Sequence, residues 1–200
     1  MANPYDVRRR IEKQQDENRL EREKARGDFR ENFGKDPKEE DLLKFRLWKE
    51  QGGFCAYSGE YLEPSRLIEP GYAEIDHILP YSRSLDDSWH NKVLVRGEEN
   101  RNKGNRTPYE YFGEENGKWG AFVTRITTWK FPVPKKSRLL EKSYDEKKES
   151  EMRERNLNDT RYITRFAANY LRSGLAFHSD SAKDPVLTLN GRLTAFLRVH

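Results

Sequence analysis

Four polar side chains in the middle of the chain are of the types that a metal-dependent nuclease uses: Asp76, His77, Asn91 and Asn100. Because a histidine titrates near neutral pH, His77 can take a proton from an attacking water molecule under physiological conditions. A carboxylate and an amide carbonyl supply oxygen ligands of the kind that Mg²⁺ prefers, and that ion keeps several of its waters. We therefore predict that Asp76 and Asn100 hold one Mg²⁺, or Mn²⁺ as its substitute, beside His77.

Other polar side chains of the same segment fit supporting roles. An amide at the start of a strand can hold the loop that follows His77 and orient its imidazole, which is the role that we expect of Asn91. Lys103 follows Asn100 at a spacing that puts both on one face of a helix, where its ammonium can neutralise phosphate charge. The candidates for contact with phosphate or DNA are Lys92, Arg101 and Lys103.

Two short strands and a helix must position these residues. Residues 72–77 predict a strand that ends on Asp76 and His77, and residues 92–95 predict the returning strand. Residues 97–103 then predict a short helix that carries Asn100. Since a β-hairpin packed on a helix brings the three polar groups to one corner, the expected fold is α+β and mainly helical, with a ββα-metal core.

Each of these residues taken alone has a simpler explanation. An Asp-His pair at the end of a strand is commonly a turn with a hydrogen-bonded histidine, and asparagines commonly cap turns. The combination within one strand–loop–strand–helix segment is what favours a catalytic site. His90 is expected to be solvated in a polar loop beside Trp89. His178 and His200 lie in polar or terminal segments with no nearby acid of fitting geometry.

The same segment resembles the HNH nuclease domain of the type II CRISPR RNA-guided DNA endonucleases, above all their compact II-C branch. Residues 71–88, 91–95 and 99–112 are similar to the two strands and the metal-binding helix of that domain. Residues 44–59 resemble its entry, and residues 156–162 resemble the return to the RuvC domain. By this resemblance His77 is the general base, Asp76 and Asn100 are the metal ligands, and Asn91 is the middle residue of the HNH name.

The resemblance implies a function and a set of partners. The family's HNH domain cuts the DNA strand that is paired to a guide RNA, and guide pairing rather than the protein reads the sequence. The expected partners are the target strand in a guide RNA–DNA heteroduplex, the RuvC domain of the parent effector and phage anti-CRISPR inhibitor proteins. We expect a cytoplasmic prokaryotic protein without membrane contact.

The resemblance also implies a division of the chain. Residues 1–30 are expected to form a charged linker helix that leads in from RuvC, and residues 31–148 the HNH nuclease domain. Residues 149–158 are expected to form a hinge linker, and residues 159–200 the start of the returning RuvC segment.

The composition is unusually polar for a compact globule, with 34% hydrophobic and 36% charged residues. Part of the chain should therefore be solvated or should pack on a partner. The formal net charge of +4 is consistent with a polyanionic partner. No apolar run approaches the length of a membrane span, and the first residues lack the apolar core of a secretion signal.

Cys55 is the one cysteine of the chain, and Ser58 stands where many HNH proteins have a second cysteine. One thiolate cannot build a four-ligand zinc site, so we predict no structural zinc. Cys55 is expected to be a small buried residue instead.

Several other segments carry local signals. Residues 5–26 predict a polar, solvated helix. Asp36, with a proline and then a glutamate after it, predicts the N-cap of a helix, and Thr107 predicts a second cap. Residues 130–148 are basic and interrupted by prolines. We expect an exposed loop, and contact of its charge with phosphates is the alternative. Residues 162–171 form an apolar helical stripe that needs a partner.

Two other functions fit the same residues. A free-standing HNH nuclease of the homing or restriction type would cut plain duplex DNA, although the flanking linkers argue against it. A catalytically silent docking module would bind a partner such as an inhibitor protein tightly and show no turnover.

Overall fold

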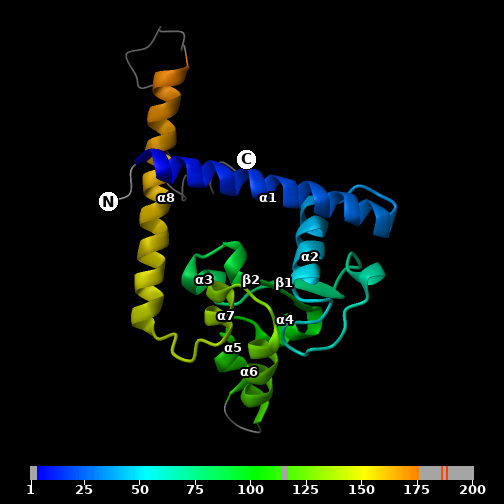
Figure 1. The fold of residues 1–200 in the computed structure, drawn as a ribbon. Helices are drawn as coiled ribbons and strands as arrows, with labels where there is room; N and C mark the ends of the chain where they lie inside the picture. Colours follow the sequence, from blue (N-terminus) through cyan, green and yellow to red (C-terminus); the bar gives the residue numbers. More distant parts are fainter. Residues whose placement is uncertain (1–3, 114–116, 176–185, 187, 189–200) are drawn as a thin grey trace, which may run out of the picture. The chain divides into compact units, whose positions relative to one another are not determined.

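The computed structural model describes residues 4–113, 117–175, 186 and 188 (Figure 1). As far as they are described, these residues divide into two compact units. The first contains residues 1–82 and 86–144, and the second contains residues 83–85 and 145–200. The candidate catalytic residues all belong to the first unit.

A two-stranded antiparallel hairpin lies at the centre of the first unit. Strand β1 (Ala73–His77) pairs with β2 (Lys92–Arg96) so that His77 stands opposite Lys92. The interior of β2 is a continuous buried apolar run, because the strand is covered on both faces. Helix α4 (Gly97–Lys103) follows β2 directly and packs on both strands. The predicted hairpin, the predicted helix and the α+β class are thus confirmed.

The junction between β2 and α4 requires a glycine. A Cβ atom added at Gly97 would lie 2.2 Å from the backbone oxygen of Gly71, which is far inside van der Waals contact. The absence of a side chain lets the two backbones meet, and it allows α4 to begin immediately after the strand. Asn100 is thereby held close to the end of β1.

Helices surround the hairpin in the first unit. They are α1 (Pro4–Phe33), α2 (Glu39–Glu50), α5 (Pro108–Phe112), α6 (Lys118–Thr128) and α7 (Val133–Leu139). The short helix α3 (Tyr81–Ser84) begins in the first unit and ends in the second. Two short 3₁₀ helices, Pro64–Arg66 and Trp89–Asn91, complete the unit. Their apolar side chains form one core with the hairpin, which includes Phe29, Phe45, Leu94, Trp119 and Phe122.

The two predicted helix caps had different outcomes. At α5 the prediction is confirmed, because Thr107 Oγ1 accepts the Glu110 N–H while the Glu110 carboxylate accepts the Thr107 N–H. At α2 the prediction was wrong, since the helix begins at Glu39 and Lys38 occupies the N-cap position. Asp36 instead pairs with the guanidinium of Arg30, because α1 runs further than expected and brings that charge within reach.

The expectation of an exposed loop at residues 130–148 was also wrong in part. Helix α7 lies inside that segment, with a proline in its first turn, where the missing N–H has no helical partner to lose. Lys135 is completely buried, and its ammonium pairs with Glu50 and lies 4.8 Å from the centroid of the Trp89 ring. Lys135 is therefore not available to a phosphate.

Cys55 is completely buried, as predicted. Its Sγ accepts backbone N–H groups from Ser58 at 3.4 Å and from Arg96 at 3.3 Å. The sulfur therefore helps to join the turn after α2 to the end of β2. Helix α1 is exposed along residues 12–24, as expected of a polar helix, and enters the core at Phe29.

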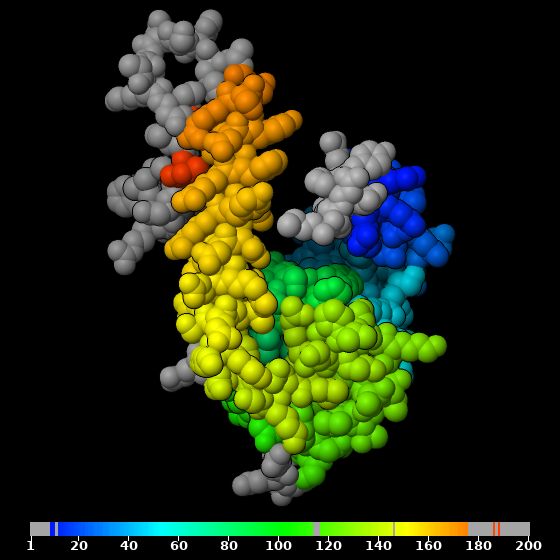
Figure 2. Space-filling view, turned by 60° about the vertical axis from the view of Figure 1, so that its left-hand side comes forward, coloured from blue at the N-terminus to red at the C-terminus, as the bar shows by residue number. Residues whose placement is uncertain are grey.

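The second unit is built on one long helix, α8 (Glu146–Gly174), which Asp145 caps by accepting the Lys148 N–H. Residues 149–158, the expected hinge, lie within this continuous helix. The predicted apolar stripe is exposed, with Tyr162 at 71% and Phe166 at 63%. Figure 2 shows α8 in yellow to orange. Most of the expected RuvC segment beyond residue 175 lies outside the described residues, so the division of the chain stays a prediction.

Within the second unit, the short piece 83–85 is attached to α8. Arg83 Nε lies 3.0 Å from Glu149 Oε2, and Asn156 donates to the backbone oxygen of Ser84 at 2.8 Å. Across the described part of the chain, no helix is long and apolar enough to cross a membrane.

Candidate active site

The end of β1 and one face of α4 border an open cavity of about 230 Å³. Asp76 and His77 reach it from the strand, and Asn100 and Lys103 reach it from the helix. Tyr81, at the start of α3, lies at the same cavity with 49% of its surface exposed. The three residues predicted to do chemistry are therefore brought together in space.

Asp76 is buried, with 6% of its surface exposed, and both of its oxygens have partners. The Lys103 ammonium lies 2.9 Å from Oδ2 and 3.2 Å from Oδ1, and the Tyr57 hydroxyl donates to Oδ2 at 2.5 Å. Burial raises the pKa of Asp76, and the nearby Lys103 charge opposes that rise. Burial likewise lowers the pKa of Lys103, against the attraction of Asp76.

Tyr57 is completely enclosed beneath this pair. Burial raises the pKa of Tyr57 well above its ordinary value, and the Asp76 carboxylate raises it further. The hydroxyl therefore keeps its proton and serves as a donor to Asp76. Asp76 is thus held in one orientation by a buried cation and a buried hydroxyl.

His77 is oriented by a carboxylate from the loop between α3 and β2. Its Nε2 lies 2.8 Å from Asp87 Oδ1, and the Lys92 ammonium lies 2.8 Å from the same oxygen. The His77 side chain is 28% exposed, and its ring centroid is 5.5 Å from that of Tyr81. The imidazole is consequently held at one nitrogen and remains partly accessible to solvent.

Asn100 is held by a second acidic side chain from β1. Its Nδ2 donates to Glu74 Oε2 at 2.8 Å, which leaves the amide oxygen available to a ligand. Arg101 lies 3.6 Å from the other oxygen of Glu74. Glu74 therefore fixes which end of the Asn100 amide serves as a possible metal ligand.

Asn91 is completely buried and ties down the loop after His77. Its Oδ1 accepts the Leu79 N–H at 2.9 Å, and its Nδ2 donates to the backbone oxygens of Leu79 at 2.9 Å and Asp86 at 2.8 Å. This geometry matches the expected loop-holding role, while the direct contact with the imidazole comes from Asp87.

The three basic candidates for phosphate contact occupy different environments. Lys103 is buried against Asp76, and the Lys92 side chain is 14% exposed and bound to Asp87. The Arg101 side chain is 63% exposed, which makes it the most accessible of the three. Their contacts with phosphate or DNA stay predictions.

The donor set fits a hard divalent cation. A carboxylate oxygen of Asp76 and the amide oxygen of Asn100 are the ligand types that Mg²⁺ and Mn²⁺ accept. Among the described residues, no group of three or more His, Cys, Asp or Glu side chains is arranged to hold a metal. A cation held by Asp76 and Asn100 would complete its shell with water and phosphate oxygens.

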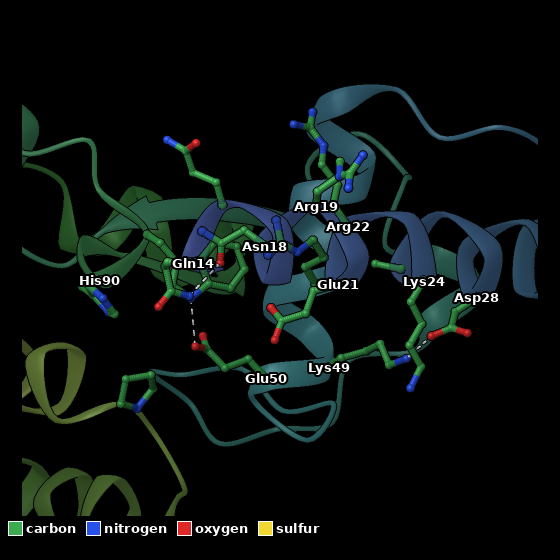
Figure 3. Close-up of a pocket in the computed structure, with 15 residues that line it drawn as sticks. Gln14, Asn18, Arg19, Glu21, Arg22, Lys24, Asp28, Lys49, Glu50 and His90 are labelled. Atoms are coloured by element: carbon green, nitrogen blue, oxygen red, sulfur yellow. Dashed lines mark hydrogen bonds and ion pairs between the residues drawn. The ribbon is translucent and has the colours of Figure 1, made fainter. Parts of the chain in front are cut away.

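A larger cavity, of about 1210 Å³, lies between α1 and α2 and includes Trp89 and His90 (Figure 3). Its lining is mostly charged, and several of those charges are already paired. Lys49 pairs with Asp28, and Glu50 accepts the indole N–H of Trp89 at 3.0 Å. None of the four predicted catalytic residues lines it, so the smaller cavity is the candidate active site.

Comparison with known proteins agrees with this geometry. A family model described as HNH endonuclease matches residues 55–109, which include the hairpin and α4. The CRISPR-associated endonuclease Cas9 of Campylobacter jejuni is 44% identical over 147 residues, covering 74% of this chain and 15% of that protein. Cas9 of Staphylococcus aureus is 39% identical over 166 residues, covering 78% of this chain and 16% of that protein. This chain carries an HNH endonuclease domain of the Cas9 type.

The likeness of this HNH domain to Cas9 extends to its three-dimensional structure. A crystal structure of Streptococcus thermophilus Cas9 in complex with the AGAA PAM matches with a TM-score of 0.65 at 30% sequence identity. That match covers 100% of this chain and 20% of the Cas9 chain. The chain thus spans about 15% of the length of the first of its curated relatives.

Sequence reasoning missed three residues that support the HNH site: Tyr57, Glu74 and Asp87. Glu74 had a signal, because side chains two apart in a strand share a face and Glu74 precedes Asp76 by two positions. Asp87 lies in an acidic pair within the loop, and nothing in that pattern pointed to His77. Tyr57 is distant in sequence and had no local signal.

Replacing Asn91 with alanine is expected to destabilise the HNH domain by about 2–4 kcal/mol. The change removes the three hydrogen bonds that the buried Asn91 side chain makes to the backbone of Leu79 and Asp86, and each such bond contributes about 0.5–1.5 kcal/mol. Urea unfolding should show a lower midpoint. A matched Asn102→Ala change, at an exposed position on α4, should leave the midpoint nearly unchanged.

Proposed function

We propose that this HNH domain nicks DNA in a reaction that depends on Mg²⁺, with His77 as the general base. The observation that carries the proposal is the convergence of His77, Asp76 and Asn100 on one small cavity. By analogy with its Cas9 relatives, the substrate is the target strand of a guide RNA–DNA heteroduplex.

Each residue has a separate part in this reaction. His77 accepts the proton of the attacking water through its imidazole. Asp76 and Asn100 would hold a divalent cation, which would offset the charge that grows on the phosphate and on the leaving oxygen. Glu74 keeps the Asn100 oxygen facing its ligand, and Asn91 keeps the backbone after His77 in place.

The second unit supports the proposal that the domain works inside a larger effector. The exposed apolar stripe of α8, which includes Tyr162, Ile163, Phe166 and Tyr170, is suited to packing against a further domain. Contact with a RuvC domain and recognition by inhibitor proteins remain predictions.

Removing the amide ligand tests the metal site directly. Asn100→Ala is expected to weaken Mn²⁺ binding by about 10-fold or more, because the cation loses one of its two protein oxygens. Titration calorimetry without DNA measures this affinity. Asn102→Ala, on the exposed side of the same helix, is the matched control and should bind Mn²⁺ like the parent chain. Equal affinities for all three proteins would remove Asn100 from the metal site.

The choice of substrate separates the alternatives. The proposal predicts a nick in a DNA strand that is paired to guide RNA within an assembled effector. Strong cutting of plain duplex DNA by the chain itself would favour a free-standing HNH nuclease. Tight binding of an inhibitor protein with no turnover on the guide-paired substrate would favour a docking module.

A further inference from the structure

The loop between α3 and β2 contributes one carboxylate that contacts the proposed base. Asp87 Oδ1 lies 2.8 Å from His77 Nε2, although the two residues are 10 positions apart. The Asp87 side chain is 65% exposed, so its position depends on its polar contacts rather than on burial. Two observations show how it is held.

Both ends of the contact are anchored to the hairpin. The Lys92 ammonium lies 2.8 Å from the same Asp87 oxygen, and Lys92 stands directly opposite His77 in the register of β1 and β2. Asn91 binds the backbone oxygen of Asp86, which immediately precedes Asp87. The carboxylate is therefore fixed by the strand that faces His77 and by the loop that the buried amide holds.

The chemistry of the contact determines which ring nitrogen carries the proton. Burial raises the pKa of Asp87, but hydrogen bonds from Lys92 and His77 outweigh it and lower the pKa below its ordinary value. An ionised carboxylate only accepts hydrogen bonds, so a neutral His77 must place its proton on Nε2. The other nitrogen, Nδ1, then carries the free lone pair that a general base needs.

We propose that Asp87 is the positioning residue of His77, which it holds in the tautomer with the proton on Nε2 while Lys92 holds the carboxylate in place. This inference rests on the proposed function of His77 as the base. The same contact stabilises the imidazolium that forms when Nδ1 accepts a proton from water. A carboxylate serves a histidine base in this way in serine proteases.

The tautomer can be measured without metal, DNA or turnover. Long-range ¹H–¹⁵N spectra of the ¹⁵N-labelled chain, recorded as a pH series up to the point where the His77 signals stop changing, distinguish the two neutral tautomers. His77→Ala identifies the signals of this ring. We expect the parent chain to carry the proton on Nε2, and Asp87→Ala to give a mixture of tautomers. Asp36→Ala removes another exposed, paired aspartate and should leave the His77 signals unchanged.

The reaction rate gives a second readout. Asp87→Ala is expected to lower kcat on an RNA-paired DNA strand by about 10- to 100-fold with little change in KM, as for other residues that orient a reacting group. Asp87→Asn keeps the size of the side chain, but its amide can donate to Nε2, so this variant should lose the tautomer preference and should not recover kcat. Lys92→Met removes the ammonium that holds the Asp87 carboxylate. Its tautomer preference and its kcat should lie between those of the parent chain and of Asp87→Ala.

Two outcomes overturn the inference. One is a parent chain in which His77 does not carry its proton on Nε2. The other is an Asp87→Ala variant with the tautomer of the parent. Neither result bears on whether His77 is the base. Conversely, full nicking activity in His77→Ala would refute the proposed function and leave the tautomer measurement intact, so the two failures are distinguishable.

Discussion

Replacing His77 with alanine is expected to slow DNA nicking by about 10²- to 10⁴-fold, the usual contribution of a general base. The water would then lose its proton to solvent rather than to an imidazole held beside the cavity. The fold should persist, because the His77 side chain is partly exposed and its polar contact is with the exposed Asp87. Single-turnover cleavage of the RNA-paired strand at saturating Mn²⁺ measures the effect.

His90 provides a matched histidine control. It lies in the 3₁₀ helix before β2 and lines the larger cavity rather than the candidate active site. His90→Ala should therefore cut at nearly the rate of the parent chain. If His77→Ala cuts as fast as His90→Ala, another group takes the proton and the assignment of the base is wrong.

Replacing Lys103 with methionine is expected to destabilise the fold by about 3–5 kcal/mol, the usual cost of leaving one partner of a buried ion pair alone. Asp76 would keep its charge at 6% exposure with Tyr57 as its remaining side-chain partner. Without the cation, burial raises the pKa of Asp76 further above that of the unfolded chain. The loss of stability should therefore be full at neutral pH and shrink as the pH falls through the folded pKa.

Divalent cations should partly reverse this loss. Mn²⁺ bound at Asp76 replaces the missing positive charge, so it should raise the unfolding temperature of Lys103→Met more than that of the parent chain. The double variant Asp76→Asn with Lys103→Met removes both charges and should recover much of the stability but none of the cleavage.

Lys92→Met tests whether burial of the Lys103–Asp76 ion pair causes the large loss of stability in Lys103→Met. Its partner Asp87 is 65% exposed, and exposed ion pairs contribute about 0–1 kcal/mol. Thermal and urea unfolding should therefore show a small change for Lys92→Met and a large one for Lys103→Met. Equal effects would mean that the Lys103–Asp76 pair contributes no more than a surface contact.

The local patterns of the chain were sufficient for the hairpin, α4 and the cap at Thr107. Strand alternation, a short apolar run and a capping box act over a few residues, so they can be recognised without knowledge of the packing. The prediction of a cap at Asp36 was wrong because the partner of this side chain is not decided by the local pattern. Arg30 from α1 competes for its carboxylate, and that competition depends on how two helices meet.

The fully buried Lys135 also shows that a local pattern does not reveal contacts with distant segments. A lysine among prolines and other basic residues predicts an exposed loop, because isolated buried charges are costly. Glu50 comes from a distant helix and supplies the countercharge, and the Trp89 and Phe131 rings lie beside the ammonium. No pattern within residues 130–148 contains that information.

The sequence was sufficient to place the candidate catalytic residues together, since Asp76, His77 and Asn100 lie on consecutive elements whose geometry follows from local spacing. Tertiary structure decided what surrounds them. Tyr57 and Lys103 enclose Asp76, and Asp87 reaches His77 through a loop whose path Asn91 holds. Such contacts join segments that only packing brings together, and packing is a property of the whole unit rather than of any short stretch of chain.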